Sequence, residues 1–201
     1  MVPMQEALQA VGYRVQNLGY PSRSASIREL SEQVFGEALT AARSNGATRL
    51  HLVTHSLGGI LARSYLAHHA VPELGHVVML GPPNRGSEIV DRLGAWKLFQ
   101  WINGPAGGEL GTTPASTPNQ LGPACFSLGV IAGSRSINWI NSLLIPGVDD
   151  GKVSVERTRL PGMADHIVVP AAHPFLMRNR TAIRQTLYFL EHGRFEAPPS
   201  S

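Results

Sequence analysis

Cysteine is almost absent from this chain, so covalent cross-links cannot hold its fold together. Cys125 is the single cysteine among 201 residues, which excludes a disulfide bond within the chain. A lone cysteine is neutral about the compartment in which a protein works. We expect Cys125 to serve as a small buried apolar side chain.

Charged residues are also few, and they are scattered along the chain. The 17 Lys and Arg exceed the 14 Asp and Glu by three, which gives a formal net charge of +3. Basic residues form no run and do not alternate with aromatic residues, as they do in many nucleic-acid-binding segments. The sequence therefore gives no support to a nucleic-acid partner.

Long apolar segments are missing as well. No stretch approaches the roughly 18 uninterrupted apolar residues of a membrane-spanning helix, and the amino terminus lacks the basic-then-apolar design of a signal peptide. As written, the sequence predicts a cytoplasmic protein with no integral membrane segment. An export signal upstream of Met1 would change that compartment, and the sequence leaves this point open.

What the chain does contain is typical of one globular domain. Hydrophobic residues make up 43% of it, and 21 Gly and 15 Pro mark its turns. Helical and strand-like periodicities alternate, which predicts an α/β fold with a mostly parallel sheet flanked by helices. We predict a single domain over 1–195, with an irregular cover or surface excursion at about 95–122, and a tail over 196–201. The predicted strands are 13–20, 49–53, 77–80, 127–132 and 165–171, and the predicted helices are 3–12, 26–44, 60–66 and 181–192.

One serine stands at the abrupt junction of a predicted strand and a predicted helix. Ser56 follows the strand 49–53 and is followed by Gly58 and Gly59, where a side chain could block close approach of helix, strand and substrate. Such a turn holds a serine hydroxyl out at the carboxyl edge of a sheet, beside the positive end of the next helix. The motif lacks the first glycine of G-x-S-x-G, because Thr54 occupies that position. Ser56 is thus either a nucleophile or an ordinary helix N-cap.

A serine nucleophile needs two partners from later strand ends. A histidine must take its proton, and an acid must orient that histidine, in the chain order Ser, Asp or Glu, His. The turn at 149–155 offers Asp149 and Asp150 as acids. His173 follows the last predicted strand, and His166 is a rival base at the start of that strand.

Three segments together resemble the α/β-hydrolase superfamily, specifically the small lipase-like bacterial hydrolases. These segments are His55-Ser56-Leu57-Gly58-Gly59, Gly81-Pro82-Pro83-Asn84-Arg85-Gly86-Ser87, and the stretch from Asp150-Gly151 to His173. The second is similar to the GTPHRGS loop of bacterial lipases, with Pro83-Asn84 in place of Pro-His. The three occur in the order that the superfamily requires.

The resemblance implies a role for each matched residue. Ser56 would be the nucleophile, Asp150 the acid and His173 the base, and the backbone N–H of Leu57 would donate to the oxyanion. The family's aspartate immediately precedes a glycine, which selects Asp150 over Asp149. His173 lies past the carboxyl end of the last strand, whereas His166 would lie at the wrong edge of the sheet.

His55 adjoins the nucleophile, and we treat it as a packing or orienting residue. The remaining histidines have no spacing that indicates a metal site, so we predict no metal: His51, His68, His69, His76 and His192.

The chain departs from the superfamily where a strand and a second oxyanion donor are expected. In the family, a strand bearing a His-Gly loop lies between those that correspond here to 13–20 and 49–53, and nothing before the first predicted helix supplies it. Either Met1 falls inside a longer gene or the chain is a shortened homologue. We favour the first, because loss of a central strand exposes two rows of backbone donors and acceptors.

The resemblance implies an esterase or lipase-like serine hydrolase that acts through an acyl-enzyme on a small-molecule ester or lipid and needs no cofactor. Trp96, Phe99 and Trp101 either line an acyl-binding pocket or belong to the core. Two alternatives stay open: an acyltransferase or amidase with the same triad, and a catalytically silent binding protein derived from a hydrolase. The natural substrate and the oligomeric state are not determined by the sequence.

Overall fold

A parallel sheet of four strands lies at the centre of the molecule. The computed structural model describes residues 1–93, 104–137 and 145–197, and within them the strand order is β1-β2-β3-β4. All three pairings are parallel, as predicted for an α/β fold. The strands are β1 (Leu50–His55), β2 (Leu74–Leu80), β3 (Leu128–Gly133) and β4 (Asp165–Val169).

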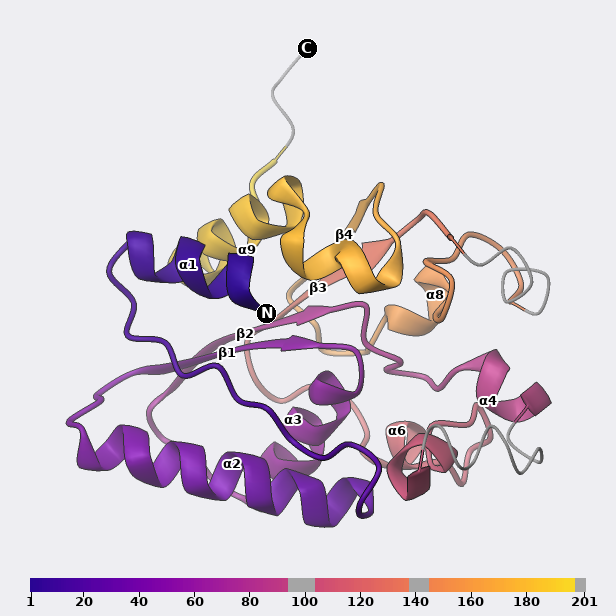
Figure 1. Cartoon of the computed structure of the whole chain (residues 1–201), viewed down its shortest axis with the longest axis horizontal. Coiled ribbons are helices and arrows are strands. Elements are labelled where there is room, and N and C mark those ends of the chain that lie inside the picture. Colours follow the sequence, from indigo (N-terminus) through magenta and orange to yellow (C-terminus); the bar gives the residue numbers. More distant parts are fainter. Residues whose placement is uncertain (94–103, 138–144, 198–201) are drawn as a thin grey trace.

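Helices cover both faces of this sheet. Helices α1 and α9 lie on one face and α2 and α3 on the other, while α4, α6 and α8 lie toward the end where the strands finish (Figure 1). The helices are α1 (Val2–Ala10), α2 (Ile27–Ser44), α3 (Leu57–His68), α4 (Glu88–Leu93), α6 (Thr117–Gln120), α8 (Val155–Thr158), η1 (His173–Arg178) and α9 (Arg180–His192).

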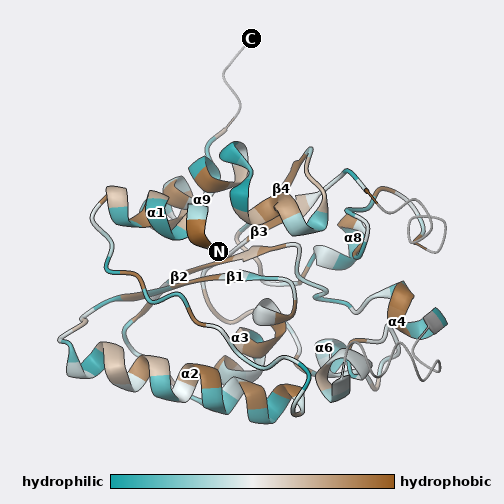
Figure 2. Cartoon of the chain, in the orientation of Figure 1, coloured by the Kyte–Doolittle hydropathy of each residue, from teal (hydrophilic) through white to brown (hydrophobic). Residues whose placement is uncertain are grey.

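Apolar residues line both faces of the sheet and form two cores. One core joins α2 and α3 to the sheet through residues such as Leu30, Ile60 and Met79. The other joins α1 and α9 to it through residues such as Met4 and Phe189. Figure 2 shows the apolar colours gathered along the strands and on the inward sides of the helices. Coverage on both faces explains why β3 is buried along its whole length.

The amino end of α2 has the predicted capping box. The Ser26 hydroxyl accepts a hydrogen bond from the Glu29 backbone N–H, and the Glu29 carboxylate accepts one from the Ser26 N–H. The capping box thereby supplies hydrogen-bond acceptors to two backbone N–H groups at the start of the helix. The helix then runs from Ile27 to Ser44, and Phe35 and Leu39 lie on its buried face.

The predicted strand over 13–20 is wrong. This segment contains no strand, and among the described residues the backbone groups of 14–19 make no hydrogen bond. A strand forms only against a partner, and β1 lies at the edge of the sheet without pairing with this segment. The segment runs beside the free edge of β1 without forming hydrogen bonds to it, so its extended backbone is not part of the sheet.

The prediction that Cys125 is buried is also wrong. Cys125 is exposed, with its Sγ 3.9 Å from the carbonyl oxygen of Pro123 in the loop after α6. Of the predicted irregular segment 95–122, residues 104–122 are described and contain α6, whereas Trp96, Phe99 and Trp101 lie outside the described residues. Glu196, at the start of the predicted tail, is held by Gln185 through its backbone N–H.

Within the described ranges, none of the helices has both the length and the apolar character needed to cross a bilayer.

Candidate active site

Ser56 occupies a strained backbone turn between β1 and α3. Its φ is 54° and its ψ is −127°, and among the described residues other than glycine it alone has a positive φ. Such a conformation is costly for a residue with a side chain and is common at functional sites. The Ser56 side chain makes no capping hydrogen bond to α3, so the structure does not support the interpretation of this serine as an ordinary N-cap.

The side chains of Ser56, His173 and Asp150 lie in one hydrogen-bonded row. The Ser56 Oγ is 2.8 Å from His173 Nε2, and His173 Nδ1 is 2.7 Å from Asp150 Oδ2. With the proton on Nδ1, the serine hydroxyl donates to Nε2 and the imidazole donates to the carboxylate. The three residues that the sequence selected are therefore brought together in the predicted order.

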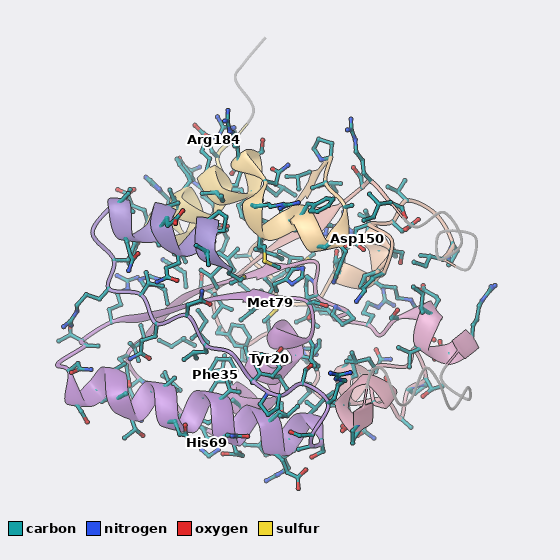
Figure 3. The ribbon with its side chains drawn as sticks, viewed as in Figure 1. Tyr20, Phe35, His69, Met79, Asp150 and Arg184 are labelled. Atoms are coloured by element: carbon teal, nitrogen blue, oxygen red, sulfur yellow. The ribbon has the colours of Figure 1, made fainter. Side chains whose placement is uncertain are left out.

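Parallel strands explain how residues so distant in sequence meet. Ser56 follows β1, Asp150 lies in the connection after β3, and His173 begins η1 just after β4. The carboxyl ends of parallel strands lie at one edge of the sheet. Figure 3 shows Asp150 at that end of the sheet, well away from Arg184 on α9.

The turn at Gly81 leaves room for the Asp150–His173 pair. Gly81 follows β2 with a φ of 55°, and a Cβ at this position would lie 3.0 Å from Asp150 Oδ2 and 3.2 Å from His173 Nδ1. A side chain there would push against the acid and the base at once, in a conformation that favours glycine.

Asp150, and not Asp149, faces the histidine. Asp150 is 1% exposed, and its Oδ1 accepts hydrogen bonds from the backbone N–H groups of Lys152 and Val153 at 3.0 and 2.9 Å. With His173 on its other oxygen, the buried carboxylate has three donors to support its charge. The Asp149 carboxylate instead accepts from the backbone N–H of Gly151, which closes the same turn.

His55 contacts the backbone of the catalytic candidate His173. Its Nε2 is 2.9 Å from the His173 carbonyl oxygen, and the two ring centroids are 4.7 Å apart. A carbonyl can only accept, so the proton of His55 is on Nε2. Burial, and next the nearby His173 ring, lower the pKa of His55 to about 4, which keeps it neutral. The prediction of an orienting or packing residue fits this contact.

His166 lies away from the row. Its Nε2 is 2.9 Å from the Thr158 hydroxyl, next to α8, and burial followed by Arg159 lowers its pKa to about 4. His166, the rival base, therefore contacts Thr158 and not Ser56. No group of three His, Cys, Asp or Glu side chains suited to a metal ion occurs within the described parts of the chain.

The backbone N–H of Leu57 stands free at the amino end of α3. Leu57 is the first residue of this helix, and its N–H has no acceptor in the part of the chain that the structure describes. The first N–H groups of a helix point outward, beside the positive end of its dipole. This donor therefore adjoins Ser56, where the resemblance expects it.

Arg63 of α3 joins the loop after β2 to α6 and the turn that follows α6, and the sequence analysis missed this residue. Its buried guanidinium donates to the Asn84 carbonyl oxygen at 2.9 Å, and to the Pro118 and Gly122 carbonyl oxygens at 2.9 and 2.8 Å. Asn84 in turn donates to the Thr158 carbonyl oxygen at 2.8 Å. The sequence signal was an arginine within the otherwise apolar start of α3, which indicates a buried cation with fixed acceptors.

Taken together, the parallel sheet, the strained serine turn and the carboxyl-edge row define an α/β-hydrolase fold. No protein-family model matches the chain, but solved structures do. The mature form of the lipase BlEst2 from Bacillus licheniformis is similar at 20% sequence identity and a TM-score of 0.75, over 93% of this chain and 83% of that one.

Two further structures extend this comparison. The propeptide form of the same lipase matches at 19% identity and a TM-score of 0.72, and phospholipase PlaB from Legionella pneumophila matches at 20% identity and a TM-score of 0.57. They are matched over 98% and 77% of this chain, which spans 47% and 40% of their respective lengths. At these identities the likeness shows the shared fold.

Proposed function

We propose that the chain is a serine-dependent carboxylic ester hydrolase that acts through an acyl-enzyme. The observation that carries this proposal is the unbroken row from Ser56 Oγ through His173 to Asp150 Oδ2, with contacts of 2.8 and 2.7 Å. The names of the similar structures, a lipase and a phospholipase, support ester substrates. The proposed substrate is a small-molecule ester or lipid.

In the acylation step, the Ser56 oxygen attacks the ester carbonyl carbon while His173 Nε2 takes the hydroxyl proton. Asp150 stabilises the resulting imidazolium, and the Leu57 N–H donates to the oxyanion. The carbon–oxygen bond to the leaving alcohol then breaks, and His173 returns the proton to that alcohol.

In the second step, water takes the place of the alcohol. His173 removes a proton from the water as its oxygen attacks the acyl carbon. When the tetrahedral intermediate breaks down, His173 returns the proton to the Ser56 oxygen, which releases the carboxylic acid and restores the Ser56 hydroxyl. The overall reaction consumes one ester and one water, and it requires no cofactor. An acyltransferase would use the same first step and a different acceptor in the second.

The test is hydrolysis of p-nitrophenyl acetate and p-nitrophenyl butyrate by the chain and by Ser56→Ala. We expect the variant to lose at least about 10³-fold in kcat, because no nucleophile remains. Ser24→Ala is the matched control, since it removes an exposed serine hydroxyl far from the row in sequence. Equal rates for the chain and Ser56→Ala would refute the proposal.

A fluorophosphonate probe tests the activated serine without a guess about the substrate. It should label the chain at Ser56, and His173→Ala should remove the labelling because the hydroxyl loses its base. Adding an alcohol during ester turnover and measuring the transferred acyl group distinguishes hydrolysis from acyl transfer. A chain that binds esters but is never labelled would instead support the silent binding protein.

A further inference from the structure

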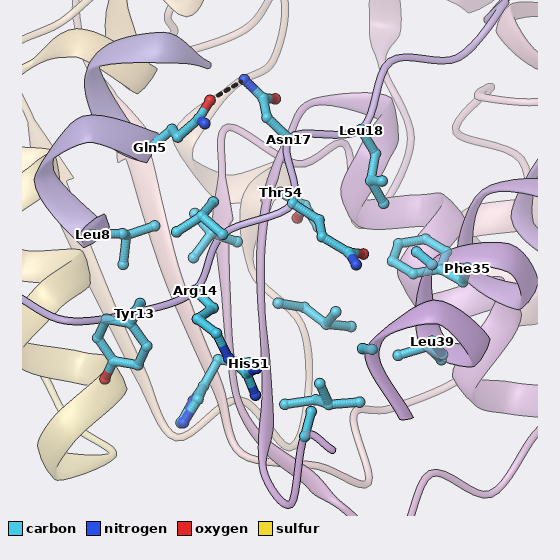
Figure 4. Close-up of a pocket in the computed structure, with 18 of the residues that line it drawn as sticks. Gln5, Leu8, Tyr13, Arg14, Asn17, Leu18, Phe35, Leu39, His51 and Thr54 are labelled. Carbon is cyan, nitrogen blue, oxygen red and sulfur yellow. Dashed lines mark hydrogen bonds between the residues drawn. The ribbon is translucent and has the colours of Figure 1, made fainter. Parts of the chain in front are cut away.

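Two cavities of the described chain differ in how their arginines are held. One, of about 770 Å³, follows β1 between α1 and α2, and Arg14 lies on its wall (Figure 4). The Arg14 guanidinium donates to the Asn45 carbonyl oxygen at 3.1 Å. The other, of about 350 Å³, lies between the segment after β3 and the loop that joins β4 to η1. Its two arginines are Arg135 and Arg178.

Both arginines of the 350 Å³ cavity lack a protein acceptor. Within residues 1–93, 104–137 and 145–197, neither the Arg135 nor the Arg178 guanidinium makes an ion pair or a hydrogen bond. None of the described residues that line the cavity is acidic. Two positive charges at one cavity repel each other, and a bound anion would turn that repulsion into two attractions.

Packing fixes the direction of one of these guanidinium groups. Arg178 Cζ lies 4.2 Å from the centroid of the Phe175 ring. The two residues are three apart on the 3₁₀-helix η1, where side chains at this spacing lie above one another. A guanidinium stacked on an aromatic face keeps its N–H groups free at the edge of its plane. Arg178 therefore loses little further side-chain freedom when it binds an anion.

The backbone adds few donors to this cavity. The backbone N–H groups of four lining residues donate to carbonyl oxygens of the protein: Arg135, Ala171, Phe175 and Asn179. Sites for phosphate groups usually present several free backbone N–H groups. Here the charged donors are guanidinium forks, whose geometry matches the two oxygens of a planar carboxylate.

The rest of the cavity wall is largely apolar. Ile137 is 67% exposed and Phe175 is 37% exposed, and both line the cavity beside Pro170 and Ala172. An inorganic anion would leave this wall in contact with water, and an uncharged alkyl chain would leave both arginines unpaired. A carboxylate that carries an apolar tail satisfies both parts of the cavity.

The cavity adjoins the loop that carries the candidate base but is distinct from the candidate active site. Ala171 and Ala172 line it, and His173 follows them directly in the chain. Ser56, His173 and Asp150 are not among the described residues that line it. A ligand there would contact the loop without entering the Ser56–His173–Asp150 row.

We propose that this cavity binds an alkyl carboxylate, with its two oxygens between Arg135 and Arg178 and its apolar tail against Ile137 and Phe175. Binding at this site does not require hydrolysis by Ser56. An acid of this class is also what hydrolysis of an acyl ester releases, and that connection alone rests on the proposed function.

The test is isothermal titration of the whole chain with sodium octanoate, 1-octanol, sodium acetate and inorganic phosphate. We expect octanoate to bind about tenfold or more tightly than each of the others, because it alone combines the charge with the tail. Equal or tighter binding of octanol would show an apolar site. Equal or tighter binding of acetate or phosphate would show a site for small anions. Each of these results would overturn the proposal.

Arginine variants locate the octanoate. Arg135→Gln and Arg178→Gln should each weaken its binding by about tenfold or more, since each removes a charge-assisted contact. Arg180→Gln is the matched control, because it removes the same charge from an exposed arginine that does not line the cavity. It should change the affinity less than about twofold. An equal loss in all three variants would show attraction by net charge alone and would overturn the proposal.

Ester hydrolysis, measured on the same samples, separates this inference from the proposed function. Octanoate binding that is unchanged in the double variant Arg135→Gln/Arg178→Gln would place the ligand elsewhere, for example at the candidate active site, and would overturn the inference. Absent octanoate binding in a chain that hydrolyses p-nitrophenyl butyrate would overturn it as well and leave the proposed function intact. Binding that depends on both arginines in a chain without esterase activity would do the reverse.

Discussion

At the scale of single residues, Ser56 shows how the sheet holds a strained turn. A non-glycine residue at positive φ costs about 1–3 kcal/mol, and the surrounding structure must fix it. The Ser56 N–H donates to Leu80 at 2.9 Å, and its carbonyl oxygen accepts from the Gly59 N–H at 3.0 Å. The turn is therefore fixed on one side by β2 and on the other by the first turn of α3, which leaves the hydroxyl aimed at His173.

The two adjacent aspartates should differ sharply when each is made neutral. Asp150→Asn replaces the carboxylate that accepts from His173 Nδ1, so the imidazole loses its orientation and its charge partner. We expect kcat for p-nitrophenyl butyrate to fall by about 10³–10⁴-fold. Asp149→Asn keeps an oxygen that can accept from the Gly151 N–H and should change kcat less than about tenfold. A larger loss from Asp149→Asn than from Asp150→Asn would exchange their roles.

His55 should act through the position of His173. His55→Phe retains a ring beside His173 but removes the N–H that donates to its carbonyl oxygen at 2.9 Å. Because a small displacement of a catalytic group slows reaction more than binding, we expect kcat to fall by about 10–10²-fold with KM nearly unchanged. His55→Gln, which can donate, should recover part of the rate. A fall in the free energy of unfolding with no change in kcat would show a packing role alone.

At the scale of elements, α9 packs closely against the sheet because Gly129 of β3 has no side chain. A Cβ on Gly129 of β3 would lie 2.6 Å from the Phe189 ring of α9 and 2.8 Å from the Phe195 ring. Phe189 is fully buried and its ring centroid is 4.9 Å from that of Phe195. The glycine therefore lets two aromatic rings pack directly on the strand backbone.

Gly129→Ala should consequently destabilise the protein without altering the candidate active site. The added methyl group must displace buried aromatic rings, which typically costs about 1–3 kcal/mol. A shift of the urea midpoint at constant m-value, with kcat per folded molecule unchanged, would match this expectation. Gly36→Ala on α2 is the matched control, since a Cβ there meets nothing within 4 Å. An unchanged midpoint for Gly129→Ala would contradict the tight packing.

The elements that the sequence predicted correctly are those whose signals are local or repeated. The Ser26–Glu29 capping box is local, and it begins α2 at Ile27. Short apolar runs predicted four of the strands, although β1 extends to His55, two residues beyond the expected end, and β2 begins at Leu74. The segment 13–20 was also predicted to be a strand, but strand formation depends on a partner that the sequence pattern cannot reveal.

The row of Ser56, His173 and Asp150 was predictable because chemistry and chain order constrain it together. A serine after one strand, an acid before glycine and a histidine after the last strand leave few choices, and Ser56, Asp150 and His173 do meet. Arg63 was not predictable in the same way, because its acceptors are carbonyl oxygens brought near by the fold. Cys125 was misplaced since a single small residue in a loop carries no periodicity that would indicate its exposure.

At the scale of the whole molecule, buried neutral histidines link folding to pH. Burial is the main cause that lowers the pKa of His55 and His166 from the ordinary value of 6.5 to about 4, and burial also lowers the pKa of His51. Below pH 6.5 the unfolded chain therefore binds protons on these rings that the folded chain does not bind. Protonation of each of these rings therefore favours the unfolded state.

The free energy of unfolding should fall as the pH is lowered from 6.5 to 4, and His55 should supply a separable part of that fall. Its folded pKa is depressed, so above pH 6.5 the ring is neutral in both states and contributes no pH dependence. Between 6.5 and 4 it contributes at most about 1.4 kcal/mol per pH unit, less where water screens it. Urea unfolding at pH 7, 6, 5 and 4.5 measures this slope for the chain and for His55→Gln. The variant cannot titrate at this position, so its slope should be shallower while the carboxylates contribute equally to both proteins. If the two slopes coincide, or if the chain gains stability as the pH falls, then the pKa of His55 in the folded chain is not depressed as its burial predicts.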